Sequence, residues 1–250
     1  MSKIYASEVV RIALGEVGYH EKASNKDLDS ATANPGSGQW TKYARDLWQA
    51  NPHYYQSNKN GLADWCAIFV DWCVYMASGQ DSVAAQAAMC YTGPYGASCA
   101  LSVNYYKAVG RFFSGPNAAP KPGDQIFFGS ASNIRHTGLV EKVVDGVVYT
   151  VEGNSGNQVR HKSYADTNPD IYGYGRPKYD EEPKKQESTE FVDVPRSKWY
   201  AKDVEWAARS GIMVGVGDNK FEPDRNITRA EVAAVSHRLY NLIVGGGGNA

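Results

Sequence analysis

The chain has 250 residues, 42% of them hydrophobic and 21% charged, which are ordinary proportions for a soluble globular protein. Its formal net charge of −1 offers neither a basic excess for nucleic acid nor a polybasic run for an anionic membrane. No apolar stretch approaches the ~20 residues of a membrane-spanning helix. The amino terminus lacks a long apolar core after a basic start, so we expect no secretory signal and synthesis in the cytoplasm.

Three helices are predicted in the first part of the chain. Residues 4–17 carry apolar side chains at helical spacing, and Gly18 ends the run. A polar loop rich in Gly, Asn and Ser follows over residues 25–38. The segment QWTKYARDLW predicts a second helix, and residues 64–76 predict a third, for which Asp64 is the candidate cap.

Strands follow these helices. KPGDQIFF predicts a turn and an apolar strand, and IYGYGRP predicts a final strand. Between them, two apolar runs are joined by Asp145-Gly146, a strong hairpin signal because such a turn needs positive φ. Because helices come first and an antiparallel sheet second, we expect an α+β domain.

The composition changes over residues 179–190, which are charged and almost free of apolar side chains. Such a segment cannot bury enough surface to fold, so we predict a linker between a domain at 1–178 and a small unit at 191–244. The small unit predicts a helix over 199–210, a turn at VGVGDN and a second helix opened by a Thr228–Glu231 capping box. Residues 245–250 are expected to be a flexible tail.

The four cysteines lie at 66, 73, 90 and 99. Cys66 and Cys73 are two helical turns apart, which is too far for a disulfide, and no C-x-x-C pair suggests zinc. Cys90 and Cys99 could pair across a Gly-Pro loop, although synthesis in the cytoplasm favours free thiols.

Cys66 is a candidate nucleophile because it lies where a helix begins, and the field of a helix N-terminus lowers a thiol pKa. On position alone, a small buried side chain is an equally good interpretation. Cys73 lies inside the same helix and is expected to be an inert core residue.

Of the five histidines, His136 is the candidate base. It begins a predicted strand, and Gly138 would allow close approach of a helix packed on the sheet. His20, His53 and His161 lie in polar stretches and are expected to be solvated. His237 is expected to be a packing or surface residue. A third group usually fixes such a histidine.

VEGNSG supplies Glu152 and Asn154 for this third role, at the end of the strand hairpinned to that of His136. Two residues apart on a strand, they are expected to point the same way. In isolation, the motif is better interpreted as an ordinary hairpin exit.

The segments DWCAIFVDWC, PKPGD, RHTGLVEKV and VEGNSG, in this order, resemble the CHAP family of cysteine- and histidine-dependent amidohydrolases and peptidases, over about residues 1–178. The resemblance implies a papain-like α+β fold and cleavage of amide bonds in bacterial peptidoglycan. It also implies that Cys66 is the nucleophile and His136 the base, that Glu152 orients the histidine, and that Asn154 assists.

At one position next to the candidate nucleophile, the sequence departs from the family pattern. Trp65 stands where many members have Gln, which leaves the side-chain half of an oxyanion hole unassigned, while the Cys66 backbone N–H supplies one donor.

Some members of the family bind calcium, for which Asp27 and Asp29 are candidate ligands. A solvated loop without metal is the favoured interpretation. No other cofactor is expected.

Residues 191–240 resemble an S-layer homology (SLH) module, through FVDV, WY, GI, FEP and ITRAE. The alternative, a plain helical hairpin, explains only the capping box. The resemblance implies binding to a secondary polymer of Gram-positive walls, pyruvylated if the family pattern holds. Candidate polymer-binding residues are Asp193, Trp199, Arg229 and Glu231. Because a lone unit of this size exposes much apolar surface, we expect self-association as a homotrimer.

Together these features predict a peptidoglycan hydrolase anchored to the wall. The expected absence of a signal favours a phage or prophage endolysin released through a holin pore. A host autolysin and a catalytically dead wall-binding protein are the alternatives. The sequence leaves open which bond is cut, that is, whether the enzyme is an amidase or an endopeptidase.

Overall fold

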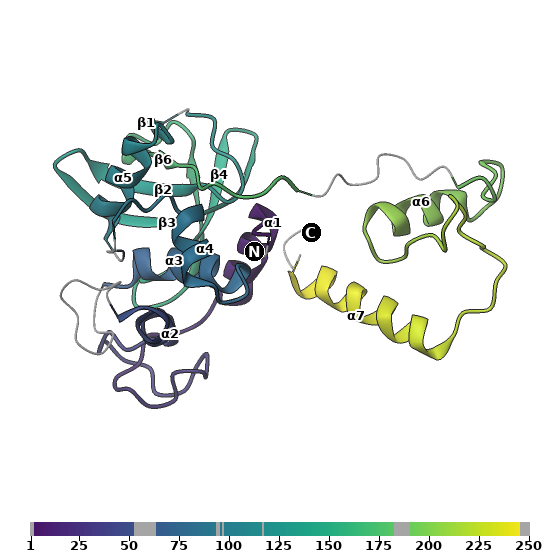
Figure 1. The fold of residues 1–250 in the computed structure, drawn as a ribbon, viewed down its shortest axis with the longest axis horizontal. Helices are drawn as coiled ribbons and strands as arrows, with labels where there is room; N and C mark the ends of the chain where they lie inside the picture. The colour runs from purple at the N-terminus through teal and green to yellow at the C-terminus, as the bar shows by residue number, and fades with distance from the viewer. Residues whose placement is uncertain are drawn as a thin grey trace. The chain divides into compact units, whose positions relative to one another are not determined.

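The structure is a computed structural model that describes residues 3–52, 64–93, 96, 98–116, 118–182 and 191–245. The chain divides into two compact units, residues 1–181 and 182–250 (Figure 1). His53, most of the expected linker (183–190) and the expected tail beyond 245 lie outside the described residues. In the described part of the chain, no helix is long and apolar enough to cross a membrane.

The first unit is organised around α3 (Cys66–Ala77), in which the ten residues from Cys66 to Tyr75 are all buried. A helix that is apolar all round belongs in a core. It packs against α1 (Ala6–Gly15), α2 (Lys42–Ala50) and the sheet. These three helices confirm the predicted ones. Two further helices were not predicted: α4 (Ser82–Ala88), capped by Asp81, and α5 (Cys99–Ala108), capped by Ser98.

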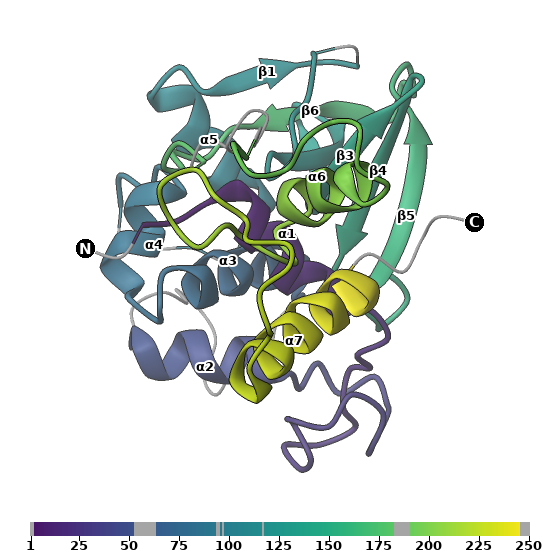
Figure 2. The same ribbon diagram turned by 90° about the vertical axis from the view of Figure 1, so that its right-hand side faces the viewer.

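The sheet is antiparallel and has six strands in the order β1-β6-β2-β3-β4-β5, of which Figure 2 shows β3, β4 and β5 side by side. The strands are β1 (Phe112–Ser114), β2 (Gln125–Ser130), β3 (Asn133–Val144), β4 (Val147–Glu152), β5 (Arg160–Ala165) and β6 (Ile171–Gly175). Asp145 and Gly146 have φ of 50° and 74°, as the predicted β3–β4 hairpin requires.

The two faces of the sheet carry separate apolar clusters, because alternate residues of a strand point to opposite sides. Phe127, Leu139 and Val151 join the main core with the helices, whereas Ile126 and Val140 belong to a second cluster on the other face. Figure 1 shows α3 and α4 on one side of the strands. The predicted α+β class, with helices packed on an antiparallel sheet, is confirmed.

The end of the first unit lies slightly beyond the expected boundary. The Tyr179 hydroxyl donates to the carbonyl of Gly123 (3.2 Å). The Asp180 carboxylate accepts from the backbone N–H of Ile4 (2.7 Å), and the Asp180 N–H donates to the Ile4 carbonyl (2.8 Å). Residues 179–181 are therefore part of the folded unit, although their composition resembles the linker that follows.

The second unit contains α6 (Ala201–Arg209) and α7 (Arg229–Gly245). Its buried apolar residues are Phe191, Val204 and Ile212. The predicted capping box is confirmed, because the Glu231 N–H donates to Thr228 Oγ1 and the Thr228 N–H donates to Glu231. Large apolar side chains on α7 remain exposed, namely Val232, Leu239, Tyr240, Leu242 and Ile243.

Candidate active site

Cys66 is the first residue of α3 and is 6% exposed. The expected cap, Asp64, is wrong: Trp65 is the N-cap and makes no side-chain capping bond, so the first N–H groups of the helix are left for other acceptors. The Ala67 N–H donates to the Cys66 sulfur. A helix N-terminus whose free donors face a sulfur favours the thiolate.

His136 lies on β3 and is half-buried, with its ring stacked on Phe128 at 5.9 Å between centroids. Its Nε2 is 2.9 Å from Glu152 Oε2, and the imidazole also hydrogen-bonds the Cys66 thiol. With Nε2 engaged by the carboxylate, the remaining ring nitrogen is the one available to the sulfur. The structure thus brings together Cys66, His136 and Glu152, which come from a helix and two strands.

Glu152 is 1% exposed and is held by further donors. The Thr150 hydroxyl donates to Oε1 at 2.6 Å, and Tyr164 also hydrogen-bonds the carboxylate. A Cβ added at Gly138 would lie 2.5 Å from Glu152 Cγ. The expected role of Gly138 was wrong: its missing side chain makes room for Glu152 on its way to His136, and not for a helix.

The ionisation states of the three groups depend on one another. A hydrogen bond from Cys99 lowers the pKa of Cys66 most; burial opposes it, His136 adds to it, and the result is about 5. Burial lowers the pKa of His136, but Cys66 and Glu152 outweigh it and raise the pKa to about 9. Burial would raise the pKa of Glu152, yet hydrogen bonds from His136 and Thr150 hold it below its usual value. Both shifts favour a thiolate at Cys66 and an imidazolium at His136 at neutral pH.

Cys99 was missed as a site residue. It was considered as a partner of Cys90, whose thiol instead lies 3.7 Å from the Ala88 carbonyl oxygen. The Cys99 sulfur lies 3.7 Å from that of Cys66. A capping serine directly before Cys99 places it at the start of α5, the same helical position that Cys66 has in α3, and this was the available signal. Cys73 is fully buried, burial raises its pKa well above normal, and its expected place in the core is confirmed.

Trp65 is fully buried beside Tyr43, and its indole N–H donates to Glu21 Oε2 at 2.8 Å. Its only polar group is therefore committed, and its side chain does not replace a glutamine donor. An oxyanion formed next to Cys66 would depend on backbone N–H groups of the α3 terminus.

Asn154 does not lie where the alternation argument placed it. Strand β4 ends at Glu152, and Asn154 follows in a turn with φ of 55°. Gly153 separates the two because a Cβ there would lie 2.4 Å from that of Phe69, so the chain turns against α3 at this point. Asn154 and Glu152 therefore do not share a strand face.

The calcium candidates face cations. Both carboxylate oxygens of Asp29 accept from Arg45, at 2.7 and 2.9 Å, and Asp27 interacts with the buried Lys22. Within the described ranges, no group of three or more His, Cys, Asp or Glu side chains is arranged to hold a metal ion. The Asp29 carboxylate is paired with a guanidinium, which argues against Asp29 as a calcium ligand.

The remaining described histidines lie outside the site. His20 pairs through its backbone with Gln158, His161 bonds Glu141, and His237 lies 3.3 Å from Asn241.

In the second unit, two of the four candidate polymer-binding residues have structural partners. Asp193 accepts the N–H groups of Phe221 and Glu222, at 2.9 and 2.7 Å. Glu231 belongs to the capping box and also binds Arg225 at 2.5 Å. Trp199 is 85% exposed, and Arg229 is the first residue of α7.

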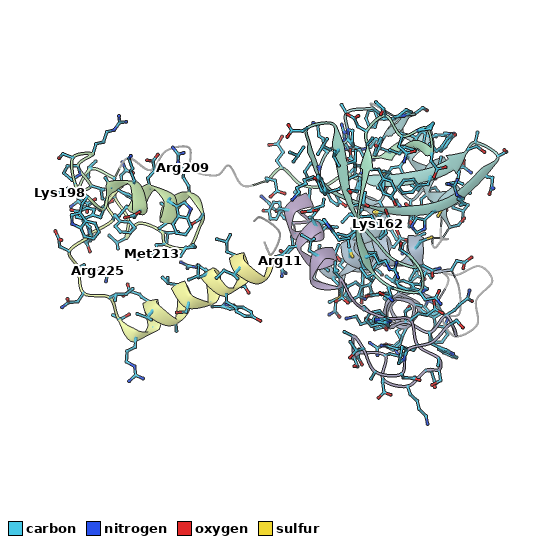
Figure 3. The ribbon with its side chains drawn as sticks, turned by 180° about the vertical axis from the view of Figure 1, so that it is seen from behind. Arg11, Lys162, Lys198, Arg209, Met213 and Arg225 are labelled. Carbon is cyan, nitrogen blue, oxygen red and sulfur yellow. The ribbon has the colours of Figure 1, made fainter. Side chains whose placement is uncertain are left out.

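This unit also carries a hollow of about 610 Å³ whose lining includes Glu231, Met213 and Arg225, the last two labelled in Figure 3. The other three candidates are not part of that lining.

Comparison with protein families identifies a CHAP domain at residues 55–154 and an S-layer homology domain at residues 190–233. The chain contains both domains. A CHAP domain implies a cysteine-dependent amidase or peptidase acting on peptidoglycan, and an SLH domain implies binding to a secondary polymer of the cell wall.

Curated relatives match over a short stretch. The chain is 41% identical over 56 residues to an amylopullulanase from Thermoanaerobacterium thermosulfurigenes and 39% identical over 54 residues to the exoglucanase XynX from Acetivibrio thermocellus. Each match covers 22% of this chain but only 3% and 5% of those proteins. No solved structure matches the chain.

Proposed function

We propose that the CHAP domain cleaves amide bonds of peptidoglycan with Cys66 as nucleophile, His136 as acid and base, and Glu152 as the group that orients the imidazole. The observation that carries this proposal is the chain of contacts from the Cys66 thiol through His136 to the buried Glu152 carboxylate. Such a thiolate attacks a carbonyl carbon without first losing a proton.

The residues then act in a fixed order. The Cys66 sulfur adds to the amide carbonyl, and the imidazolium of His136 protonates the leaving nitrogen, so that an acyl-enzyme remains. The imidazole next takes a proton from water, which attacks the thioester and releases Cys66. Glu152 keeps Nε2 occupied throughout, so that the other ring nitrogen faces the sulfur.

Turbidity clearing of isolated Gram-positive walls tests the assignment. We expect Cys66→Ala and His136→Ala to lose lysis to a similar extent while remaining folded, because the effects of substituting residues that act as one catalytic unit are not additive. A folded Cys66→Ala variant that still clears walls refutes the nucleophile. Mass spectrometry of the released fragments decides between a muramoyl–alanine amide and a peptide bond.

We further propose that the SLH domain anchors the chain to an anionic, pyruvylated wall polymer. The guanidinium of Arg229 at the start of α7 suits a carboxylate, and the exposed Trp199 offers a face for a sugar. The uncovered apolar side chains of α7 support self-association, which we propose to be trimeric. Loss of wall binding in Arg229→Ala, with the fold retained, is the expected result; unchanged binding contradicts the role of Arg229.

Within the class of wall hydrolases, we propose an endolysin that needs a holin to reach its substrate. Bacteria that express the chain should lyse only when a holin is co-expressed. Lysis without a holin would favour the autolysin alternative. Retained wall binding without any clearing by the unaltered chain would favour the wall-binding protein without activity.

A further inference from the structure

The candidate site contains a second thiol. Cys66 and Cys99 are the first residues of α3 and α5, and their sulfur atoms lie 3.7 Å apart, although the residues are 33 positions apart in the chain. This is hydrogen-bonding distance for sulfur. Since Cys99 is not among the residues that the proposed mechanism uses, its place against the nucleophile needs an explanation.

The surroundings decide which of the two thiols keeps its proton. Both begin helices, so the helix termini do not distinguish them. His136, positively charged when protonated, hydrogen-bonds Cys66, whereas the carboxylate of Asp71 acts on Cys99. Negative charge is therefore favoured on Cys66 and disfavoured on Cys99. These charges favour Cys99 as the donor of the bond and Cys66 as its acceptor.

We propose that Cys99 is a positioning residue for the nucleophile, whose S–H donates to the Cys66 sulfur and holds that sulfur as a thiolate aimed for attack. The sulfur then has donors from three segments, namely the Ala67 N–H in α3, the His136 ring in β3 and Cys99 in α5. A thiolate held by three donors has little freedom to rotate about its χ1 bond. The proposal rests on the proposed role of Cys66, but its test does not need wall hydrolysis.

The pH dependence of Cys66 alkylation measures this contribution directly. Among the described residues, the titratable groups facing Cys66 are His136, which is bonded to Glu152, and Cys99, on which the Asp71 carboxylate acts. Changing Cys99 alone leaves the other groups in place. A charge-assisted hydrogen bond corresponds to about one pH unit in the midpoint of a titration.

The experiment follows iodoacetamide labelling of the Cys66 peptide by mass spectrometry from pH 4 to 10. This range includes the pKa of Cys66, about 5, and that of His136, about 9. We expect Cys99→Ala to raise the midpoint by about one unit. Cys99→Ser keeps a donor and should stay close to the unaltered chain. Cys90→Ser is the matched control, because the Cys90 thiol bonds the Ala88 carbonyl and the Lys178 backbone, away from Cys66, and the Cys66 midpoint should not move in this variant.

Two results overturn the proposal. One is an unchanged midpoint in Cys99→Ala, and the other is a shift in Cys99→Ser as large as that in Cys99→Ala, which would indicate a loss of packing and not of a donor. If the labelling midpoints shift as expected but the unaltered chain does not clear walls, the role of Cys99 is supported and the proposed function is contradicted. The two failures are thus distinguishable.

A second measurement uses the unaltered chain, in case Cys99→Ala does not fold. The Cys66 thiolate attacks hydrogen peroxide, forming a sulfenic acid and releasing hydroxide. The Cys99 sulfur then attacks that sulfenic sulfur, a disulfide forms, and the thiol proton leaves with the hydroxyl as water. Because an S–S bond is ~2.05 Å long, the sulfurs need to approach by only about 1.6 Å.

We expect the Cys66–Cys99 disulfide to appear in a non-reducing digest and dithiothreitol to restore Cys66 labelling. Peroxide that converts Cys66 to the sulfinic acid without any disulfide would overturn the contact, and with it the proposal.

Discussion

Gly138→Ala should disable the site although none of its three residues, Cys66, His136 and Glu152, is substituted. The added Cβ would lie 2.5 Å from Glu152 Cγ and 3.1 Å from the Val151 carbonyl oxygen. Carbon atoms pack at about 3.5–4.0 Å, so the Glu152 side chain has to move by about 1 Å. Its carboxylate then leaves the 2.9 Å contact with His136 Nε2. A displacement of this size at a catalytic group costs on the order of 100-fold in rate.

Wall clearing by the purified variant measures the effect, with the thermal unfolding temperature recorded beside it. The overpacking should cost about 1–3 kcal/mol, so the variant is expected to fold. Gly15→Ala is the matched control, because a Cβ there meets nothing within 4 Å and its activity should be unchanged. Normal lysis by a folded Gly138→Ala variant would show that the position of Glu152 does not control the imidazole.

Four further outcomes are expected. Cys73→Ser should lower stability, because it buries a hydroxyl in the core, yet retain lysis; a folded but inactive variant would point to the wrong cysteine. Lysis should rise with pH through about 5, as Cys66 ionises, and fall through about 9, as His136 loses its proton; a profile flat across both limbs contradicts the ion pair. Glu152→Gln should be milder than His136→Ala in wall clearing, because an amide oxygen still accepts from the imidazole. Light scattering should give a trimer for the full chain and a monomer for a truncation after Glu182; a monomeric full chain at all concentrations removes the trimer.

Local signals were sufficient for the parts of the site that depend on one element. Cys66 begins a helix as predicted, and His136 lies on a strand as predicted, although β3 begins three residues earlier, at Asn133. Asp145-Gly146 set the pairing at the turn of the β3–β4 hairpin, but a bulge between Val140 and Lys142 shifts the register by one residue before it reaches Glu152. The two partner strands could therefore be anticipated from short-range chemistry, but not the alignment of Glu152 with His136.

The errors concern contacts that short-range chemistry does not determine. Cys99 meets Cys66 only because α5 and α3 pack with their starts together, which nothing in either helix specifies. Asn154 was misplaced because the strand ends at Glu152, where the close approach of Gly153 to Phe69 forces a turn. The edge strand β5 is polar and largely exposed, so it lacks the alternation that identifies a strand.

The hydrogen bonds between Ile4 and Asp180 hold the amino-terminal end of the first unit against its carboxy-terminal end. A domain whose two ends are fastened together behaves as a cassette: a neighbour can be attached or exchanged at one point without disturbing the interior. For this chain the exchange point lies after Asp180, downstream of every residue that the proposed chemistry uses. A unit joined at that point can be exchanged for another without breaking the hydrogen bonds that hold the two ends of the first unit together.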